Sequence, residues 1–87
     1  MASYKLVFKK SVAKDLRSIP NSDVKRILSR IQALADNPRA DDCIKLSGQE
    51  RYRVRQGDYR IIYEIHDGRL VVLVIAVGHR SSIYQSR

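Results

Sequence analysis

The first half of the chain shows two helical stripes of apolar residues behind a short alternating segment. Residues 4–8 alternate closely enough between apolar and polar side chains to predict a short strand. Residues 9–19 then carry apolar side chains at helical spacing, and Pro20 ends that helix. A second apolar stripe covers residues 24–35, with Asn21 or Ser22 as its cap and Asn37-Pro38 after its end. We therefore expect two antiparallel helices that form a hairpin.

The second half of the chain changes to a period of two, which is typical of strands. Strands are predicted at residues 44–46, 51–55, 59–65 and 70–77, and the breaks between them are rich in turn-forming residues. Residues 70–77 are apolar on both faces, so this strand should lie in the interior of the sheet. The pattern predicts one α+β domain over residues 1–87: an N-terminal strand, a two-helix hairpin, and a four-stranded antiparallel meander with the helices packed on one sheet face.

Two turns set the expected strand register. Asp67-Gly68 is the stronger hairpin signal, because a type I′ turn needs positive φ at both central residues. As a two-residue turn it pairs Ile65 with Leu70, Tyr63 with Val72, and Ile61 with Val74. The preceding hairpin turns on Gln56-Gly57 or on Gly57-Asp58, and these place Arg60 opposite Arg53 or Arg55, respectively.

Four arginines fall on one face of this sheet in either register. Strand alternation groups Tyr52, Val54, Tyr59, Ile61 and Tyr63 with the aliphatic side chains, and leaves Arg51, Arg53, Arg55 and Arg60 on the reverse face. Like charges directly across a strand pair destabilise a sheet. The arginines are then either a solvated face that keeps the domain soluble, or a cluster of guanidinium groups shaped for phosphate.

The segment VGHRSSIY, residues 77–84, follows the apolar strand. Gly78 is expected to break the strand and to bring His79, Arg80 and Tyr84 to one edge of the sheet. His79 is either an acid or base or a surface histidine beside an arginine. Tyr84 either stacks on a base or donates a hydrogen bond, or it packs the tail back on the domain.

Composition narrows the classes of function. Seventeen Lys plus Arg against nine Asp plus Glu give a net charge of +8, which favours nucleic acid or an acidic protein as partner. We find no membrane segment and no secretory signal, so we expect a cytoplasmic protein. The lone Cys43 can form neither an internal disulfide nor a zinc site, and we expect no metal and no cofactor.

The chain resembles the RelE branch of the RelE/ParE toxins of toxin-antitoxin operons. The resemblance rests on KLSG (45–48), RYRVRQGDYRIIYEI (51–65), Asp67-Gly68 and VGHRSSIY (77–84), in the family's order and spacing. It implies a RelE/ParE-like fold and a metal-independent endoribonuclease that cuts mRNA in the A site of the ribosome, beside 16S rRNA. In that reaction the ribose 2′-hydroxyl attacks the adjacent phosphate. The resemblance also implies a cognate antitoxin, which the charge of this chain predicts to be acidic.

The resemblance assigns roles residue by residue. Arg60 matches the phosphate-binding arginine, Arg80 the arginine at the leaving group, and Tyr84 the tyrosine that stacks against or orients the substrate nucleotide. Arg53 and Arg55 stand where RelE-type enzymes often have lysines, and arginine is a poor general base. Further RNA contacts are expected from Lys45, Arg51 and His79. Only three residues separate Arg80 from Tyr84, a shorter spacing than in many relatives.

The sequence is also compatible with two other functions. One is a ParE-type inhibitor, which shares the fold and acts by binding DNA gyrase, although ParE-type chains generally lack the Arg-x-x-x-Tyr ending. The other is an RNA-binding module without catalytic activity. A translation assay with mapping of the cleaved ends separates these three functions.

Overall fold

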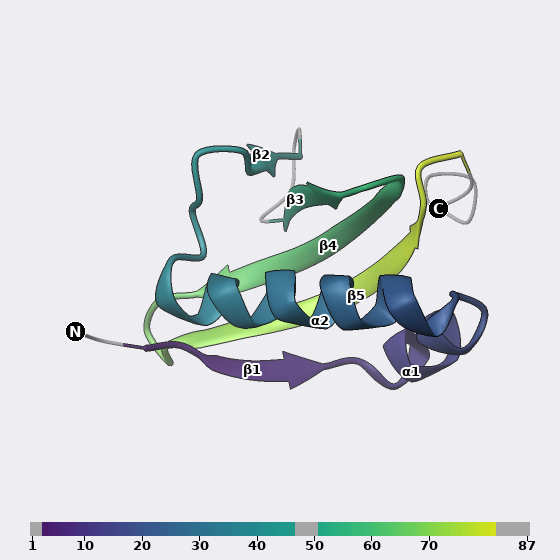
Figure 1. Ribbon diagram of the computed structural model, residues 1–87. Coiled ribbons are helices and arrows are strands. Elements are labelled where there is room, and N and C mark those ends of the chain that lie inside the picture. Colours follow the sequence, from purple (N-terminus) through teal and green to yellow (C-terminus); the bar gives the residue numbers. More distant parts are fainter. Residues whose placement is uncertain (1–2, 47–50, 82–87) are drawn as a thin grey trace.

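The computed structural model describes residues 3–46 and 51–81. Two helices cover one face of a five-stranded sheet (Figure 1). In chain order the elements are β1 (Lys5–Phe8), α1 (Lys10–Arg17), α2 (Asn21–Asp36), β2 (Ile44–Lys45), β3 (Arg51–Gln56), β4 (Tyr59–His66) and β5 (Val71–His79). The predicted α+β class is confirmed.

The sheet has the strand order β1-β5-β4-β3-β2. β5 lies between β1 and β4, so the prediction that this apolar strand is interior is confirmed. β1 runs parallel to β5 with Val7 opposite Leu73, whereas β2 to β5 form the expected antiparallel meander. The N-terminal strand thus becomes the fifth strand of the sheet, a place that the sequence pattern left open.

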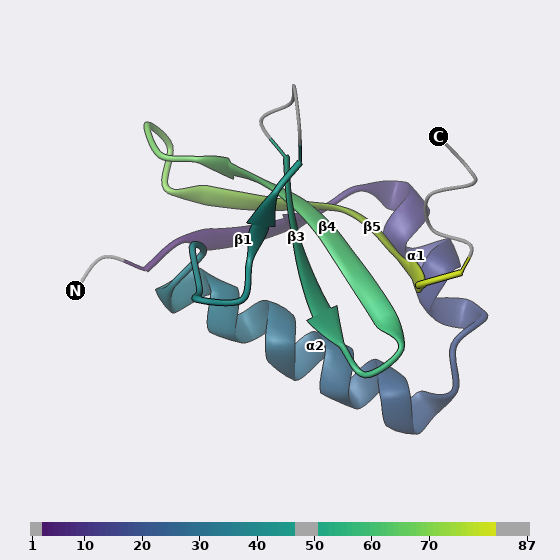
Figure 2. The same ribbon diagram turned by 90° about the horizontal axis from the view of Figure 1, so that it is seen from above.

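Both helices pack against the same sheet face, which we call the covered face. Val12 of α1 is 1% exposed, and Ile27, Ile31 and Leu34 of α2 are fully buried. The spacing of four and three residues in α2 puts its buried side chains on one stripe. They form the main core with Val54, Ile61, Tyr63, Val72, Val74 and Val77 from the sheet. Figure 2 shows α2 running obliquely across the strands. Neither described helix is long and apolar enough to cross a membrane.

The helix ends differ from the prediction. α1 ends at Arg17, and the N–H groups of Ser18 and Ile19 donate to the carbonyls of Asp15 and Leu16, so residues 18–19 form a tight last turn instead of continuing the helix. α2 begins at Asn21 with Pro20 as its cap, and no side chain caps it. Asn21 and Ser22 therefore lie inside the first turn, and the expectation that one of them is the cap is wrong.

The turn between β4 and β5 is longer than predicted. His66 pairs with Val71, so four residues, Asp67 to Leu70, connect the strands. Leu70 has φ of 54° and is 42% exposed, while Gly68 does not have positive φ. The predicted type I′ turn and the pairing of Ile65 with Leu70 are therefore wrong, because the residue of this turn with positive φ is Leu70 and not Gly68. The observed pairs are Ile65 with Val72 and Tyr63 with Val74.

A β-bulge in β5 shifts the register again. Tyr63 pairs with Val74, but Ile62 pairs with Ala76, so Ile75 is an extra residue in β5. Ile61 consequently lies opposite Val77 and not Val74, which corrects the third predicted pair. Val77 thereby returns to the covered face. Ile62, Ile75 and Ala76 form a second, smaller apolar cluster with Leu46 and Leu73.

Candidate active site on the open sheet face

The hairpin between β3 and β4 sets the geometry of the candidate site. Gln56 pairs with Tyr59 and Arg55 with Arg60, so Gly57-Asp58 is the two-residue turn. Gly57 has φ of 60°, a conformation that favours glycine. Of the two registers left open by the sequence, the structure therefore selects the one that puts Arg55 opposite Arg60. Both side chains lie on the sheet face opposite the helices, which we call the open face.

Three rows of paired residues cross the open face. The first joins Arg51 to Glu64, and their Nε and Oε2 atoms are 3.3 Å apart. The second joins Arg53 to Ile62, and the third joins Arg55 to Arg60. Glu64 thus compensates Arg51 at the end of β3 away from the turn, and the like-charged pair of Arg55 and Arg60 lies at the turn end.

Arg60 is the most unusual side chain of the site. It is half-buried, and its Nε and Nη1 atoms are buried without a hydrogen-bond partner among the described residues. On the neighbouring strand β5 it pairs with Gly78, a residue without a side chain. A guanidinium that is removed from water without an acceptor destabilises the folded protein, because it loses hydration and gains no hydrogen bond. Two nitrogen atoms of Arg60 therefore have no acceptor among the described residues, and phosphate oxygens fit the guanidinium fork.

Arg80 joins this end of the sheet through its backbone. Its N–H donates to the carbonyl of Asp58 in the β3–β4 turn over 2.9 Å. β5 continues through Gly78 to His79, so the expectation that Gly78 breaks the strand is wrong. The continued strand, tied to the turn, brings the Arg80 backbone to the end of the hairpin that carries Arg55 and Arg60.

His79 lies apart from the arginines. It pairs with Tyr59, whose side chain belongs to the main core, and the two rings meet edge to face with centroids 5.7 Å apart. Its Nδ1 accepts the backbone N–H of Ser81 over 3.1 Å and lies 2.8 Å from Ser81 Oγ. The register therefore places His79 on the covered side of the sheet, whereas Arg60 lies on the open side.

The other predicted site residues are also dispersed. Lys45 pairs with Tyr52, so it shares the side of the sheet opposite Arg53. Tyr84 lies outside the described residues. The structure thus gathers Arg53, Arg55, Arg60 and the Arg80 backbone, adds Arg51 at a distance, and leaves Lys45 and His79 on the other side.

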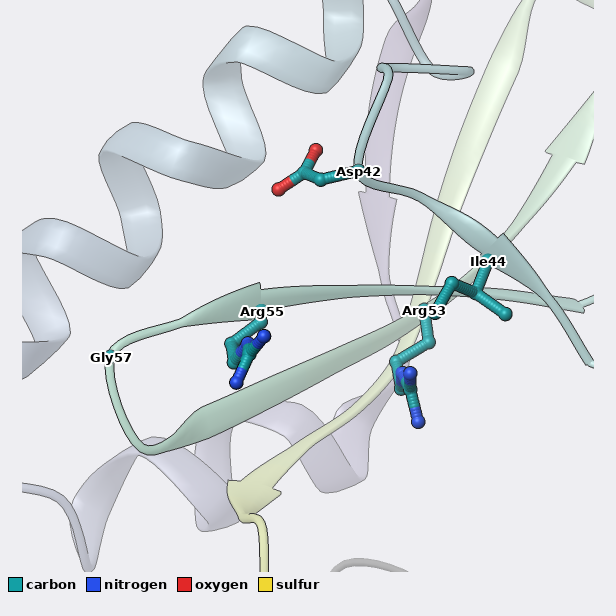
Figure 3. Close-up of a pocket in the computed structure, with 5 residues that line it drawn as sticks. All are labelled: Asp42, Ile44, Arg53, Arg55 and Gly57. Carbon is teal, nitrogen blue, oxygen red and sulfur yellow. The ribbon is translucent and has the colours of Figure 1, made fainter.

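A pocket adjoins the two β3 arginines. It has a volume of about 410 Å³ and is lined by Asp42, Ile44, Arg53, Arg55 and Gly57. Arg53 and Arg55 point to the same side of the strand, and Asp42 points away from them toward the helix (Figure 3). Asp42 is ion-paired with Arg30 of α2. Sequence reasoning missed Ile44 and Asp42. An apolar residue in a very short strand beside a run of arginines was the available signal for Ile44.

Other carboxylates are also engaged away from Arg55 and Arg60. Arg39 binds Asp67 through two hydrogen bonds of 3.1 and 2.9 Å, and the Tyr4 hydroxyl donates to the same carboxylate. These donors, Arg39 first and Tyr4 second, lower the pKa of Asp67 to about 2. Asp15 accepts the backbone N–H of Val77. Both carboxylates are thus engaged by other donors, and the acidic residue nearest to Arg55 and Arg60 along the chain is Asp58 in the connecting turn.

Acidic and soft metal ligands do not cluster in the described part of the chain. Within residues 3–46 and 51–81, no group of three His, Cys, Asp or Glu side chains is close enough to hold a metal ion. The open face instead offers guanidinium groups, which bind anions.

Comparison with known proteins identifies the family of this chain. The sequence model of the family described as "ParE toxin of type II toxin-antitoxin system, parDE" matches residues 6–84. The chain is 26% identical over 92 residues to the "mRNA interferase toxin RelE" of Escherichia coli K12, covering 94% of this chain and 90% of that protein.

Solved structures give the same relationship. The toxin in the archaeal RelE-RelB complex from Pyrococcus horikoshii OT3 superimposes with a TM-score of 0.81 at 31% identity, over 92% of this chain and 98% of that one. The RelB-RelE complex from Methanococcus jannaschii gives a TM-score of 0.74 at 32% identity, over 92% and 96%. The chain therefore belongs to the RelE/ParE family of toxins from type II toxin-antitoxin systems.

Proposed function

We propose that this toxin is a ribosome-dependent endoribonuclease that cuts mRNA in the A site. The observation that carries the proposal is Arg60, whose buried Nε and Nη1 atoms have no partner among the described residues. It lies opposite Arg55, at the end of the sheet that also holds the Arg80 backbone. Such a site is suited to an anion with several acceptor oxygens, and the phosphodiester of RNA is one.

The proposed reaction is a transesterification. The ribose 2′-oxygen attacks phosphorus and forms a new P–O bond, while the bond from phosphorus to the 5′-oxygen breaks. The proton of the 2′-hydroxyl passes to water and the departing 5′-oxygen takes a proton from water, which leaves a 2′,3′-cyclic phosphate and a 5′-hydroxyl. Arg60 holds the phosphate, Arg80 stabilises the leaving oxygen, and Arg53 and Arg55 stabilise the charge that develops on phosphorus.

Ribosome dependence is part of the proposal because the described site is rich in charge and poor in proton carriers. Arginine keeps its proton at neutral pH, and His79 lies on the other side of the sheet. The protein then supplies electrostatic stabilisation, and the ribosome supplies the in-line geometry of the 2′-oxygen. Positioning of this kind accounts for several kcal/mol in model reactions, roughly 7 at the low end.

A cognate antitoxin is the second proposed partner. Two of the similar structures are complexes of a RelE with a RelB. The net charge of +8 on 87 residues predicts that the antitoxin segment that binds here is acidic, and that its association slows as salt rises. A salt-independent association rate would contradict this.

The decisive experiment supplies purified toxin to ribosomes stalled on a defined message and maps the 5′ ends of the fragments. We expect cleavage within the A-site codon, and hardly any cleavage of the same RNA free in solution at equal enzyme concentration. Efficient cleavage of the naked RNA would contradict ribosome dependence. Absence of cleavage in both, with translation unaffected, would contradict the nuclease itself.

Inhibition of DNA gyrase is the second candidate function, because the matching family is described by its ParE members. A supercoiling assay with purified gyrase distinguishes it. Loss of supercoiling at toxin concentrations that leave ribosome-bound message intact would support the gyrase inhibitor and overturn our proposal. Binding of RNA without cleavage would instead indicate a non-catalytic RNA-binding module.

A further inference from the structure

The pocket beside β3 combines two kinds of surface. Arg53, Arg55 and Gly57 line one part, and Ile44 lines another (Figure 3). Its volume of about 410 Å³ falls in the range of small-molecule sites, roughly 300 to 1,000 Å³. A cationic part joined to an apolar part matches a nucleotide, which joins a phosphate to the flat, weakly hydrated face of a base.

Ile44 has little role in holding the fold together. It is 49% exposed, the largest value among the exposed large apolar side chains of the described residues. It pairs with Arg53 in β2, a strand of two residues, and it belongs to neither apolar cluster. The side chain is therefore free to contact something that lies above the open face.

The acidic residue of the pocket does not oppose an anion. Asp42 is ion-paired with Arg30, whose side chain is only 19% exposed, and it points toward α2 and away from the arginines. Without this pairing, a carboxylate in the pocket would repel a phosphate. The Arg30 contact thus keeps the cationic part of the pocket uncompensated by Asp42.

The pocket also adjoins the residue that would hold the reacting phosphate. Arg55 lines it and lies directly opposite Arg60 on the neighbouring strand. Neighbouring strands are about 4.8 Å apart, so the backbone of Arg60 lies one strand away from a residue that lines the pocket. One RNA chain can therefore contact both places with consecutive nucleotides.

We infer that this pocket is a nucleotide subsite in which Ile44 carries the face of a base and Arg53 and Arg55 bind its phosphate. The inference rests on the proposed function, because it takes the occupant to be the nucleotide next to the cleaved bond. An aliphatic side chain contacts the face of a base and makes no hydrogen bond to its edge, so it does not distinguish the hydrogen-bonding patterns of the four bases. The subsite should therefore accept all four bases and bind the larger purines more tightly.

Binding, and not cleavage, tests this subsite. The probes are adenosine 3′,5′-bisphosphate, which has a base, and inorganic pyrophosphate, which has none; each is titrated into the full-length toxin by calorimetry. The variants are Ile44→Ala and, as a matched control, Phe8→Ala, which truncates an apolar side chain of similar exposure, 42%, on the opposite edge of the sheet. Circular dichroism verifies that both variants are folded.

We expect Ile44→Ala to weaken the bisphosphate roughly fivefold and to leave pyrophosphate within about twofold, because only the contact with the base is lost. Phe8→Ala should change neither. Equal weakening of both probes, or no weakening of the bisphosphate, would overturn the subsite. Bisphosphate binding that depends on Ile44 in a toxin that fails to cut message would support the subsite while contradicting the nuclease, so the two failures are distinguishable.

Discussion

The two faces of the sheet differ in what they do for the molecule. The main core between the covered face and the helices contains eleven buried residues, and one of them, Tyr63, donates its hydroxyl to the carbonyl of Pro38 over 2.6 Å. The open face buries only Ile62, Ile75 and Ala76 in the second cluster and carries the arginines around them. Stability therefore resides mainly on one face, while the other retains charge that the fold does not require.

The comparison also shows where the protein leaves polar groups without partners. No described polar or charged residue is fully buried in the core. On the open face, by contrast, Arg60 has two buried nitrogen atoms without a described partner and lies opposite another arginine. Substitutions on the two faces should therefore separate effects on stability from effects on activity.

The largest expected effect is on the covered face. Ile31→Ala removes most of a fully buried side chain and leaves a cavity between α2 and the sheet. The free energy of unfolding should fall by about 2 to 5 kcal/mol in urea denaturation. Ile44→Ala is the control on the open face, where the same truncation at an exposed site should cost less than about 0.5 kcal/mol. Equal losses at both positions would contradict the division between the faces.

Arg60→Ala is the corresponding test of activity. Loss of the phosphate-binding guanidinium should lower the single-turnover rate on saturating ribosomes by about 10²-fold or more. The fold should persist, because Arg60 belongs to neither apolar cluster and two of its buried nitrogen atoms have no partner among the described residues. Arg69→Ala, an exposed arginine in the β4–β5 turn, removes the same charge elsewhere and should leave the rate nearly unchanged. Arg80→Ala should resemble Arg60→Ala.

A smaller change should move stability and activity in opposite directions. Arg55→Gln removes one member of the like-charged pair that Arg55 forms with Arg60. We expect the free energy of unfolding to rise by about 0.5 kcal/mol and the cleavage rate to fall roughly tenfold. Arg55→Lys keeps the charge, so both quantities should stay near those of the wild type. A loss of stability in Arg55→Gln would show that this arginine supports the fold.

The smallest effect should come from the far end of the sheet, where Asp67 is held by Arg39 and Tyr4. Its folded pKa of about 2 lies below the ordinary value near 3.9 in an unfolded chain. The carboxylate therefore stabilises the fold above about pH 4, and this contribution is lost as the pH falls toward 2. Asp67→Asn should lower the Tm at pH 7, and its difference from the wild type should shrink on acidification. Asp41→Asn, an exposed control, should show no such trend.

The sequence predicted the elements better than their registers. Helical and alternating apolar patterns located both helices and all five strands, because periodicity directly reports which side chains are buried. The β4–β5 pairing failed for two physical reasons. Leu70 adopts a left-handed conformation that its residue type disfavours, and the bulge at Ile75 adds a residue that an all-apolar segment does not reveal.

The candidate site was predictable in part. Alternation alone put Arg53, Arg55 and Arg60 on one face, and the Gly57-Asp58 turn was one of two registers considered. The separation of His79 from these arginines was not predictable, because it depends on β5 continuing through Gly78. The pocket at Ile44 required three dimensions, since Asp42, Ile44 and Gly57 meet only after the connection from α2 has folded beside β3.

The bulge at Ile75 makes the length of β5 more consequential than its composition. Val72 and Val74 lie before the bulge and alternate onto the covered face. Val77 lies three residues after Val74, and it shares that face because one extra residue intervenes. Substitution among small aliphatic residues there would preserve this phase. Deletion of Ile75 would restore regular pairing and leave Gly78 opposite Arg60, whereas insertion of a further residue would turn Val77 outward and displace Arg80 from the carbonyl of Asp58. Over the course of evolution, this strand should therefore accept changes of aliphatic residue type but no added residue, while insertions accumulate in the turns on either side.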